Sequence, residues 1–314
     1  MLIILLWIII LILCLAVLIK SSDFFTDAAK KTGVILGVSP FIVGVTIVAL
    51  GTSLPELSSA IWSVLKGSSE IVAGNVVGSN IANILLIIGI AALVSKKMRV
   101  KFDLTETDLP FLTGTTFLVG MMLLDRKFSL GDAIICLAVY SFYLVYLGSK
   151  RKKELTQTAE KEIKWSVPLL LPIILILSGL GIYFGSKYTI VAVIRLSELL
   201  NIGSDVIAIS VIALGTSLPE LAVTVAAARK NHPEIAFGNI IGSNIFNILV
   251  VFGIPGLISD LRISDQIIQF GLPMLIGTTI LFYFFSENRE INKWEGGMFL
   301  LIYVFFILKI TGII

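Results

Sequence analysis

The sequence predicts an all-α integral membrane protein of about ten transmembrane helices, arranged as two inverted five-helix repeats with broken or kinked helices 2, 3, 7 and 8. The first observation is composition: of 314 residues, 57% are hydrophobic and 14% are charged, against roughly 25% charged in an average soluble domain. The second is length, because ten spans of about 20 residues each would use most of the chain and leave no room for a separate soluble domain. The third is a pair of motifs that occurs twice.

Ten stretches lack Asp, Glu, Lys and Arg, and each predicts one helix. They are 1–19, 32–55, 71–95, 109–124, 133–149, 165–186, 206–219, 235–259, 267–285 and 296–308. The first has neither the basic start nor the small-residue cleavage site of a signal peptide, so we expect it to remain as a helix. The second and seventh end at Glu56 and Glu220, beyond which apolar residues resume. Those two helices should therefore each carry a buried acid.

The remaining charges and the cysteines concern topology and partners. Cys14 and Cys136 lie in apolar stretches, which predicts core residues and neither a disulfide nor a cysteine metal site. If the N-terminus is outside, seventeen of the 24 Lys and Arg residues fall in cytoplasmic loops, among them Lys20, Lys30 and Lys31, whereas Lys187 falls outside. The positive-inside rule then places both termini outside the plasma (inner) membrane. The predicted partners are the lipid bilayer and inorganic cations, with no nucleic acid and no obligatory protein partner.

The internal repeat determines the predicted architecture. VALGTSLPEL at 48–57 returns as IALGTSLPEL at 212–221, and GNVVGSNIANIL at 74–85 returns as GNIIGSNIFNIL at 238–249, both at an offset of 164. Five helices per copy is an odd number, so the second copy must cross the membrane in the opposite sense. The predicted division is a first repeat at 1–149, a cytoplasmic linker at 150–164 and a second repeat at 165–314. Inverted repeats are typical of secondary transporters, whose binding site lies near the membrane midplane.

Glu56 and Glu220 need a partner that neutralises their charge, because a charge at the bilayer centre costs about 2.5 kcal/mol or more. No Lys, Arg or His is predicted at comparable depth, since the one histidine, His232, falls in a loop. The partner of the two acids is therefore a bound cation or a proton. Pro55 and Pro219 directly precede the acids and should kink helices 2 and 7, which frees backbone oxygens.

Hydroxyl and amide oxygens accompany the acids in both copies. Helices 2 and 7 supply Thr52, Ser53, Thr216 and Ser217, and helices 3 and 8 supply Ser79, Asn83, Ser243 and Asn247. Oxygen-only sites of six to eight ligands suit Ca²⁺, and Mg²⁺ is less favoured because it keeps its waters. Two interpretations without ion binding stay open. Serines and threonines in membrane helices often hydrogen-bond to their own backbone, and Gly-x-x-x-Gly spacings such as those at 74–78 and 238–242 are often helix-packing surfaces.

The doubled motifs resemble the α-repeats of the sodium/calcium exchangers in the cation/calcium antiporter superfamily, especially the prokaryotic members. GTSLPE at 51–56 and 215–220, with GNxxGSNxxN at 74–83 and 238–247, carries this resemblance. It implies that helices 1 and 6 slide as a gate across the other eight. It also implies four cation positions. The central calcium position would use Glu56, Glu220 and the backbone oxygens of Thr52 and Thr216, and Asn83 and Asn247 would line the middle position. The flanking sodium positions would use the carbonyls of Ala49 and Ala213 with Ser53, Ser79, Ser217 and Ser243.

The predicted function is a Na⁺/Ca²⁺ antiporter working by alternating access, with Ca²⁺ and Na⁺ as transported ions and no organic cofactor. Potassium-dependent relatives carry aspartate where this chain has Asn247, and proton-coupled exchangers show GNxxE where it has GNVVGSN and GNIIGSN. The alternative is an H⁺-coupled divalent exchanger, because a proton also neutralises a buried carboxylate. A cation channel or ion sensor is less favoured by an inverted repeat. An enzyme is least favoured, since no catalytic motif is visible.

Overall fold

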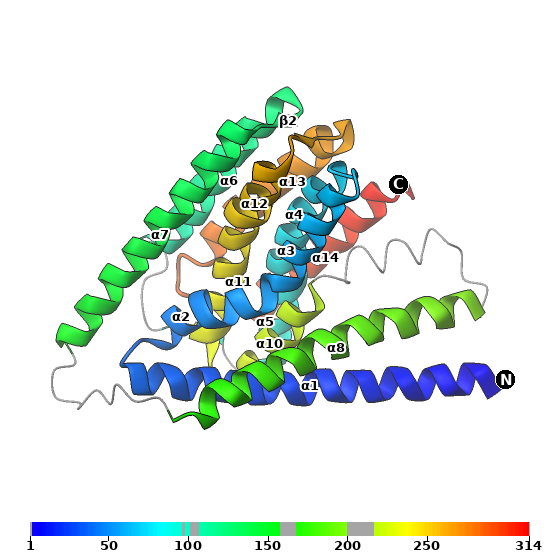
Figure 1. The fold of residues 1–314 in the computed structure, drawn as a ribbon. Coiled ribbons are helices and arrows are strands. Elements are labelled where there is room, and N and C mark those ends of the chain that lie inside the picture. The colour runs from blue at the N-terminus through cyan, green and yellow to red at the C-terminus, as the bar shows by residue number, and fades with distance from the viewer. Residues whose placement is uncertain (1, 96–97, 101–106, 158–167, 200–216, 314) are drawn as a thin grey trace.

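The computed structural model describes residues 2–95, 98–100, 107–157, 168–199 and 217–313. Two long helices, α1 (Leu2–Leu36) and α8 (Leu170–Leu199), lie side by side along the base of the molecule, and the other helices form a slanted bundle above them (Figure 1). Within the described residues, seven helices are long and apolar enough to cross a membrane. Large apolar side chains such as Leu177 and Leu301 are exposed on the outer faces, as expected for surfaces that contact lipid. The all-α membrane fold is confirmed.

Each helical segment overlaps one of the predicted ranges, although several boundaries differ. After α1 come α2 (Pro40–Val43), η1 (Gly44–Val48), α3 (Ala49–Leu65), α4 (Glu70–Ala82), η2 (Asn83–Ile88), α5 (Gly89–Val94), α6 (Asp108–Met122), η3 (Leu123–Asp125) and α7 (Leu130–Gln157). After α8 come α10 (Leu218–Arg229), α11 (Pro233–Phe246), η4 (Asn247–Val251), α12 (Phe252–Ile258), η5 (Ile267–Gly271), α13 (Leu272–Phe285) and α14 (Lys293–Ile310). The seventh predicted helix is described from Leu218 onward, so the count of ten stays a prediction.

Helix α1 is longer than predicted, and the expected loop around Lys20, Lys30 and Lys31 is wrong. All three lysines lie within a single helix of 35 residues. The part of α1 that carries these lysines contains no proline or glycine before Gly33. A charged residue by itself does not end a helix. The helix ends instead at Gly37, whose φ of 65° is the left-handed conformation of a C-terminal cap. The next helix begins at Pro40, with Ser39 as its N-cap.

Helix α8 corrects a second assignment in the same way. Lys187 was predicted in a loop outside the membrane, but it lies in the middle of α8. Residues 187–199 contain neither proline nor glycine, so nothing in the sequence ends the helix at the lysine. A charged residue inside a span was therefore misread as a boundary.

Three of the spans predicted to be broken contain π-helical turns, in which the backbone bonds skip one residue further than in an α-helix. They are η1 in the second span, η2 in the third and η4 in the eighth. η2 begins at Asn83 and η4 begins at Asn247, positions that are related by the 164-residue offset. η5 in the ninth span was not predicted. Pro55 lies inside α3, which continues through it.

Two short antiparallel pairings join loops from the two predicted halves. β1 (Met98–Arg99) pairs with β4 (Glu290–Ile291), and β2 (Lys127–Phe128) pairs with β3 (Leu261–Arg262). Met98 pairs with Ile291, and Lys127 pairs with Arg262. The repeat offset of 164 residues relates Met98 to Arg262 and Lys127 to Ile291, so each pair is the repeat counterpart of the other. β1 precedes α6 and β2 follows it, so the pairings lie at opposite ends of that helix. This register supports the predicted inverted halves.

The core of the bundle lies where the second and eighth spans cross. A Cβ atom on Gly238 would lie 2.6 Å from the Phe41 carbonyl oxygen, and one on Gly242 would lie 2.6 Å from that of Val45. Only glycine allows the two backbones to approach this closely. In the second copy the Gly-x-x-x-Gly spacing is therefore a packing surface. A Cβ on Gly74 or Gly78 meets no described atom within 4 Å.

Candidate ion-binding site

The described residues of the predicted site are all buried although most are polar. Glu56 is 1% exposed and Glu220 is 0% exposed. The others that the structure describes are Ala49, Thr52, Ser53, Ser79, Asn83, Ser217, Ser243 and Asn247, each buried. Ala213 and Thr216 lie outside the described residues. Burial of this many polar groups in one bundle requires partners for them.

A direct hydrogen bond joins the two copies of the acidic motif. Ser53 lies three residues before Glu56 on α3, and its Oγ donates to Oε1 of Glu220 on α10 at 2.9 Å. This bond places the Glu220 carboxylate beside α3, next to the helical turn that carries Glu56. The first copy thus supplies a hydroxyl to the acid of the second, and the structure brings the two glutamates together at one place.

Several buried oxygen atoms at this place have no hydrogen-bond partner among the residues that the structure describes. They are Glu56 Oε1 and Oε2, Glu220 Oε2, Ser243 Oγ, Asn80 Oδ1, Asn83 Oδ1 and Asn247 Oδ1. Nearly all buried polar atoms in folded proteins are paired. A group of unpaired oxygens that includes two carboxylates is what a bound cation would satisfy, because oxygen ligands suit Na⁺ and Ca²⁺ alike.

Asparagine side chains that sequence reasoning missed connect the two halves around the acids. Asn83 Nδ2 donates to Asn244 Oδ1 at 2.9 Å, and Asn244 Nδ2 donates to the Asn80 carbonyl oxygen at 3.5 Å. Asn239 forms hydrogen bonds with both Thr52 and Thr224. Asn80, Asn239 and Asn244 belong to the repeated GNxxGSN motif, so the repeat itself could have indicated them. Thr224 lies outside both motifs and had no such signal.

A pocket of about 240 Å³ lies between α8 and the two motif prolines. Its wall includes Pro55 and Pro219, which precede the two glutamates, and Ser186 and Lys187 of α8. Ser186 is 3% exposed, and its Oγ has no hydrogen-bond partner within the described chain. Lys187 also lines this pocket, but it is exposed, so the absence of a basic residue at the depth of the acids stays a prediction.

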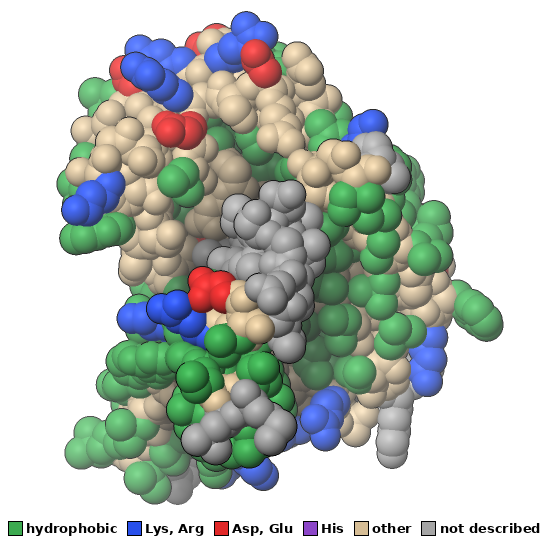
Figure 2. Space-filling model, turned by 90° about the vertical axis from the view of Figure 1, so that its right-hand side faces the viewer, with side chains coloured by type: hydrophobic (Ala, Val, Ile, Leu, Met, Phe, Trp, Pro, Cys, Tyr) green, Lys and Arg blue, Asp and Glu red, His purple; other side chains and the backbone are tan. Residues whose placement is uncertain are grey.

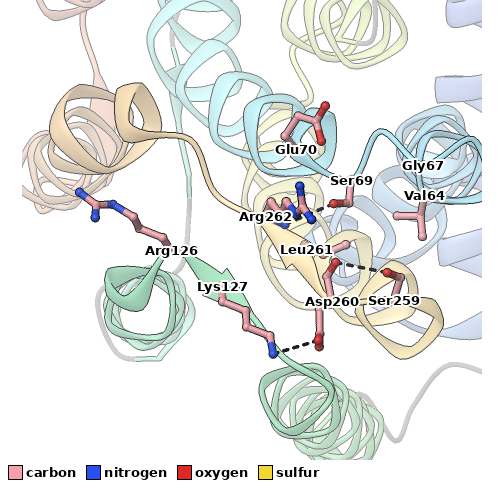
Figure 3. A pocket seen from close by; sticks show the side chains of 10 residues that line it. All are labelled: Val64, Gly67, Ser69, Glu70, Arg126, Lys127, Ser259, Asp260, Leu261 and Arg262. Atoms are coloured by element: carbon pink, nitrogen blue, oxygen red, sulfur yellow. Dashed lines mark hydrogen bonds and ion pairs between the residues drawn. The ribbon is translucent and has the colours of Figure 1, made fainter.

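A larger pocket, of about 550 Å³, lies at the end of the bundle that carries β2 and β3 (Figure 3). Lys127 Nζ lies 2.9 Å from Asp260 Oδ2, and this ion pair raises the pKa of Lys127. Arg126 pairs with Asp265 at 2.7 Å. Figure 2 shows charged side chains gathered at the top, the end where β2 lies in Figure 1. The side chains of both ion pairs are more than half exposed, so this end of the bundle faces water.

The family model described as "Sodium/calcium exchanger protein" matches residues 6–148 and 170–312. The chain belongs to the sodium/calcium exchanger family. The two matched stretches begin and end 164 residues apart, the offset of the repeated motifs. The resemblance that the motifs suggested is confirmed.

Curated relatives match along nearly the whole chain. The sodium/calcium exchanger MaX1 of Methanosarcina acetivorans is 35% identical and covers 95% of this chain and 96% of its own length. The inner membrane protein YrbG of Escherichia coli is 32% identical, over 91% of this chain and 90% of its own. Among solved structures, the sodium-calcium exchanger NCX_Mj soaked with 2.5 mM Na⁺ and 0.1 mM Sr²⁺ superposes with a TM-score of 0.80 at 28% identity, covering 96% of this chain and 98% of that one.

Proposed function

We propose that this family member is a secondary antiporter that exchanges Na⁺ for Ca²⁺ across the plasma membrane by alternating access. The observation that carries the proposal is the buried pair Glu56 and Glu220, which Ser53 joins and whose remaining carboxylate oxygens lack partners in the described chain. The names of MaX1 and NCX_Mj, both sodium/calcium exchangers, support the choice of ions.

Charge explains how one site serves both ions in turn. Two ionised carboxylates carry two negative charges, which one Ca²⁺ or two Na⁺ neutralise. In a buried site either occupant removes the cost of the unpaired charges, so the two ions compete. Exchange results when the protein changes the membrane side to which the site opens only while the site holds ions.

The proposed ligands are the residues predicted from the motifs. We assign the central calcium position to both glutamates with the backbone oxygens of Thr52 and Thr216, and the middle position to Asn83 and Asn247. The flanking sodium positions take the carbonyls of Ala49 and Ala213 with the hydroxyls of Ser53, Ser79, Ser217 and Ser243. Burial of every described member supports the set. No further protein chain is required, because the buried oxygens of one chain come from both of its predicted halves.

We further propose that α1 and α8 form the movable part. The two helices pack chiefly against each other, and they lie across the base of the bundle (Figure 1). The 240 Å³ pocket is lined by α8 and by the two motif prolines, each of which directly precedes one of the glutamates. A displacement of α8 would therefore open or close the route from this pocket to the carboxylates.

The test is ⁴⁵Ca²⁺ uptake by the purified chain in proteoliposomes, with outward Na⁺, K⁺ and H⁺ gradients imposed separately. Uptake should require internal Na⁺ and should stop when Glu56 is replaced by glutamine. Equal uptake driven by a proton gradient in sodium-free buffer would establish the H⁺-coupled alternative instead. Uptake without any counter-ion would identify a channel.

A further inference from the structure

Lys230 connects α1 to the turn that follows α10. Its Nζ atom lies 2.9 Å from Asp27 Oδ2 and 3.5 Å from Asp23 Oδ1, and it donates a hydrogen bond to the Asp23 carbonyl oxygen at 2.8 Å. The Lys230 side chain is 27% exposed, so water and salt screen this contact less than an ion pair on the open surface. One lysine thus binds two acids of a helix that we assign to the movable part.

The helix that ends at Lys230 carries one of the proposed ion ligands. Lys230 is the C-cap residue of α10, which has Glu220 in its first turn. In the other half, Lys66 is likewise the C-cap residue of α3, which carries Glu56. The repeat offset of 164 residues relates Lys66 to Lys230. Each helix that carries a motif glutamate therefore ends at a lysine.

The two acids in this contact have no acidic counterparts in the repeat. The offset relates Asp23 to Lys187 and Asp27 to Val191. Both counterparts lie on α8, and both line the 240 Å³ pocket beside the two motif prolines. At the positions equivalent to the two carboxylates, Lys66 would therefore meet an ammonium group and an apolar side chain.

The equivalent helix pairs of the two halves are packed unequally. Helix α1 packs against α10 more extensively than α8 packs against α3, although the repeat makes these pairs counterparts. Thr26 on α1 is 0% exposed, whereas its counterpart Ile190 on α8 is partly exposed and lines the pocket. The structure is therefore closed between α1 and α10, and it has a pocket between α8 and α3.

Alternating access in an inverted repeat exchanges the conformations of the two halves around a fixed site. In the opposite state, α8 should therefore pack against α3 as α1 now packs against α10. That movement would separate Lys230 from Asp23 and Asp27, and it would bring Lys66 toward Lys187. The first change removes an attraction and the second creates a repulsion, so both raise the free energy of the opposite state.

We propose that the contact of Lys230 with Asp23 and Asp27 is a latch that favours the present state, and that repulsion between Lys66 and Lys187 disfavours the opposite one. This inference rests on the proposed alternating access, but it does not depend on which ions are exchanged. It makes the two states unequal although the ion ligands repeat. Loss of the latch should increase the population of the opposite state.

The population of the opposite state can be measured by cysteine labelling. With Cys14 and Cys136 replaced, a single cysteine is placed at Thr26 or at Ile190, and the purified protein in lipid nanodiscs reacts with a water-soluble maleimide. Position 26 is buried now and should react only when the opposite state opens, so its rate is proportional to the population of that state. Position 190 reports the pocket of the present state. Both faces of a nanodisc are accessible, so the result does not depend on topology.

Lys230→Met should speed labelling at position 26 by about three- to tenfold, the range for one partly exposed charged contact. It should not speed labelling at position 190. Lys187→Asp should have the same two effects, because the aspartate would attract Lys66 in the opposite state. Lys187 lies on a different helix from position 26, so local loosening around the reporter does not explain an effect of this variant.

Lys127→Met is the matched control, because Lys127 forms an ion pair with Asp260 at 2.9 Å and lies on neither α1 nor α8. It should leave both labelling rates unchanged. The inference is overturned if either Lys230→Met or Lys187→Asp leaves the rate at position 26 unchanged, or if Lys127→Met speeds it equally. Faster labelling at both positions would show general loosening and would also overturn it.

The labelling assay requires no transport. A parent protein that takes up no calcium in proteoliposomes would therefore overturn the proposed function, while the labelling rates would still decide whether the latch exists.

Discussion

Glu56 and Glu220 have unequal surroundings although their motifs are identical in sequence. Glu220 accepts a hydrogen bond from Ser53, whereas neither oxygen of Glu56 has a partner in the described part of the chain. Sequence alone could identify the pair, because an acid inside an apolar run is rare. It could not identify this inequality, which depends on which hydroxyls of the other half reach each carboxylate.

Glutamine at either position should weaken Ca²⁺ binding by far more than tenfold. A unit charge about 4 Å from another is worth about 4 kcal/mol at an effective dielectric of 20, and an amide supplies no charge and cannot bind a cation through two oxygens. Calorimetric titration of Glu56→Gln and Glu220→Gln measures the loss. Binding within tenfold of the parent by either variant would remove that glutamate from the site.

Asn247 is completely buried, and neither its amide nitrogen nor its amide oxygen has a partner among the described residues. Asn247→Asp would add a third negative charge to the site. We expect at least tenfold tighter Ca²⁺ binding at alkaline pH, and stronger competition by protons as pH falls, because a buried carboxylate takes up a proton readily. Calcium titrations of parent and variant between pH 6 and 9, with and without K⁺, measure both effects. Superimposable curves would show that Asn247 does not line the ion sites.

At the scale of elements, α1 is tied to the turn between α10 and α11 by charges that the sequence analysis assigned to loops. Lys230 Nζ lies 2.9 Å from Asp27 Oδ2 and 3.5 Å from Asp23 Oδ1. Lys30 Nζ lies 3.2 Å from His232 Nε2. An ammonium group only donates, so His232 accepts and must be neutral at that nitrogen.

Acidification should loosen this contact. The pKa of His232 lies below its usual value, chiefly because the ring is partly withdrawn from water and also because Lys30 is adjacent, while Asp27 and Glu234 act in the opposite direction. A lowered pKa means that the neutral ring stabilises the fold above about pH 6.5, and that this contribution is lost as pH falls below that value. The parent should therefore lose roughly 1–2 °C more in unfolding temperature between pH 8 and pH 5.5 than His232→Gln does. Equal losses would show that His232 does not contribute.

The helix starts that the sequence located best are those with a local start signal. Pro233 and the Asn292–Glu295 capping box begin helices within about three residues of the predicted starts at 235 and 296, whereas the second helix begins at Pro40 and not at 32. The ends of α1 and α8 were misjudged because charged residues were taken as boundaries, although lysine is a good helix former. The π-helical turns carry no sequence signature of their own.

At the scale of the whole molecule, the two ends of the bundle are distinct, and the excess of basic residues in alternate loops predicts which end faces the cytoplasm. Arg126, at the β2 end, is predicted outside, and Lys152 is predicted inside. With Cys14 and Cys136 replaced, a cysteine at position 126 should react with an impermeant maleimide from outside only, and one at position 152 from the cytoplasm only. The opposite pattern would invert the topology and leave the site unchanged.

The pairings β1–β4 and β2–β3 and the close approach of Gly238 to the second span hold the predicted halves together at both ends and in the middle. Covalent continuity is then dispensable. Two separately encoded polypeptides, residues 1–149 and 165–314, should assemble in one membrane, copurify through a tag on either piece and recover calcium uptake. Pieces that never associate would show that the linker is needed for assembly. Activity recovered from the two pieces would mean that the halves associate like the subunits of a dimer. Each half would then contribute residues to an ion site that neither half forms alone.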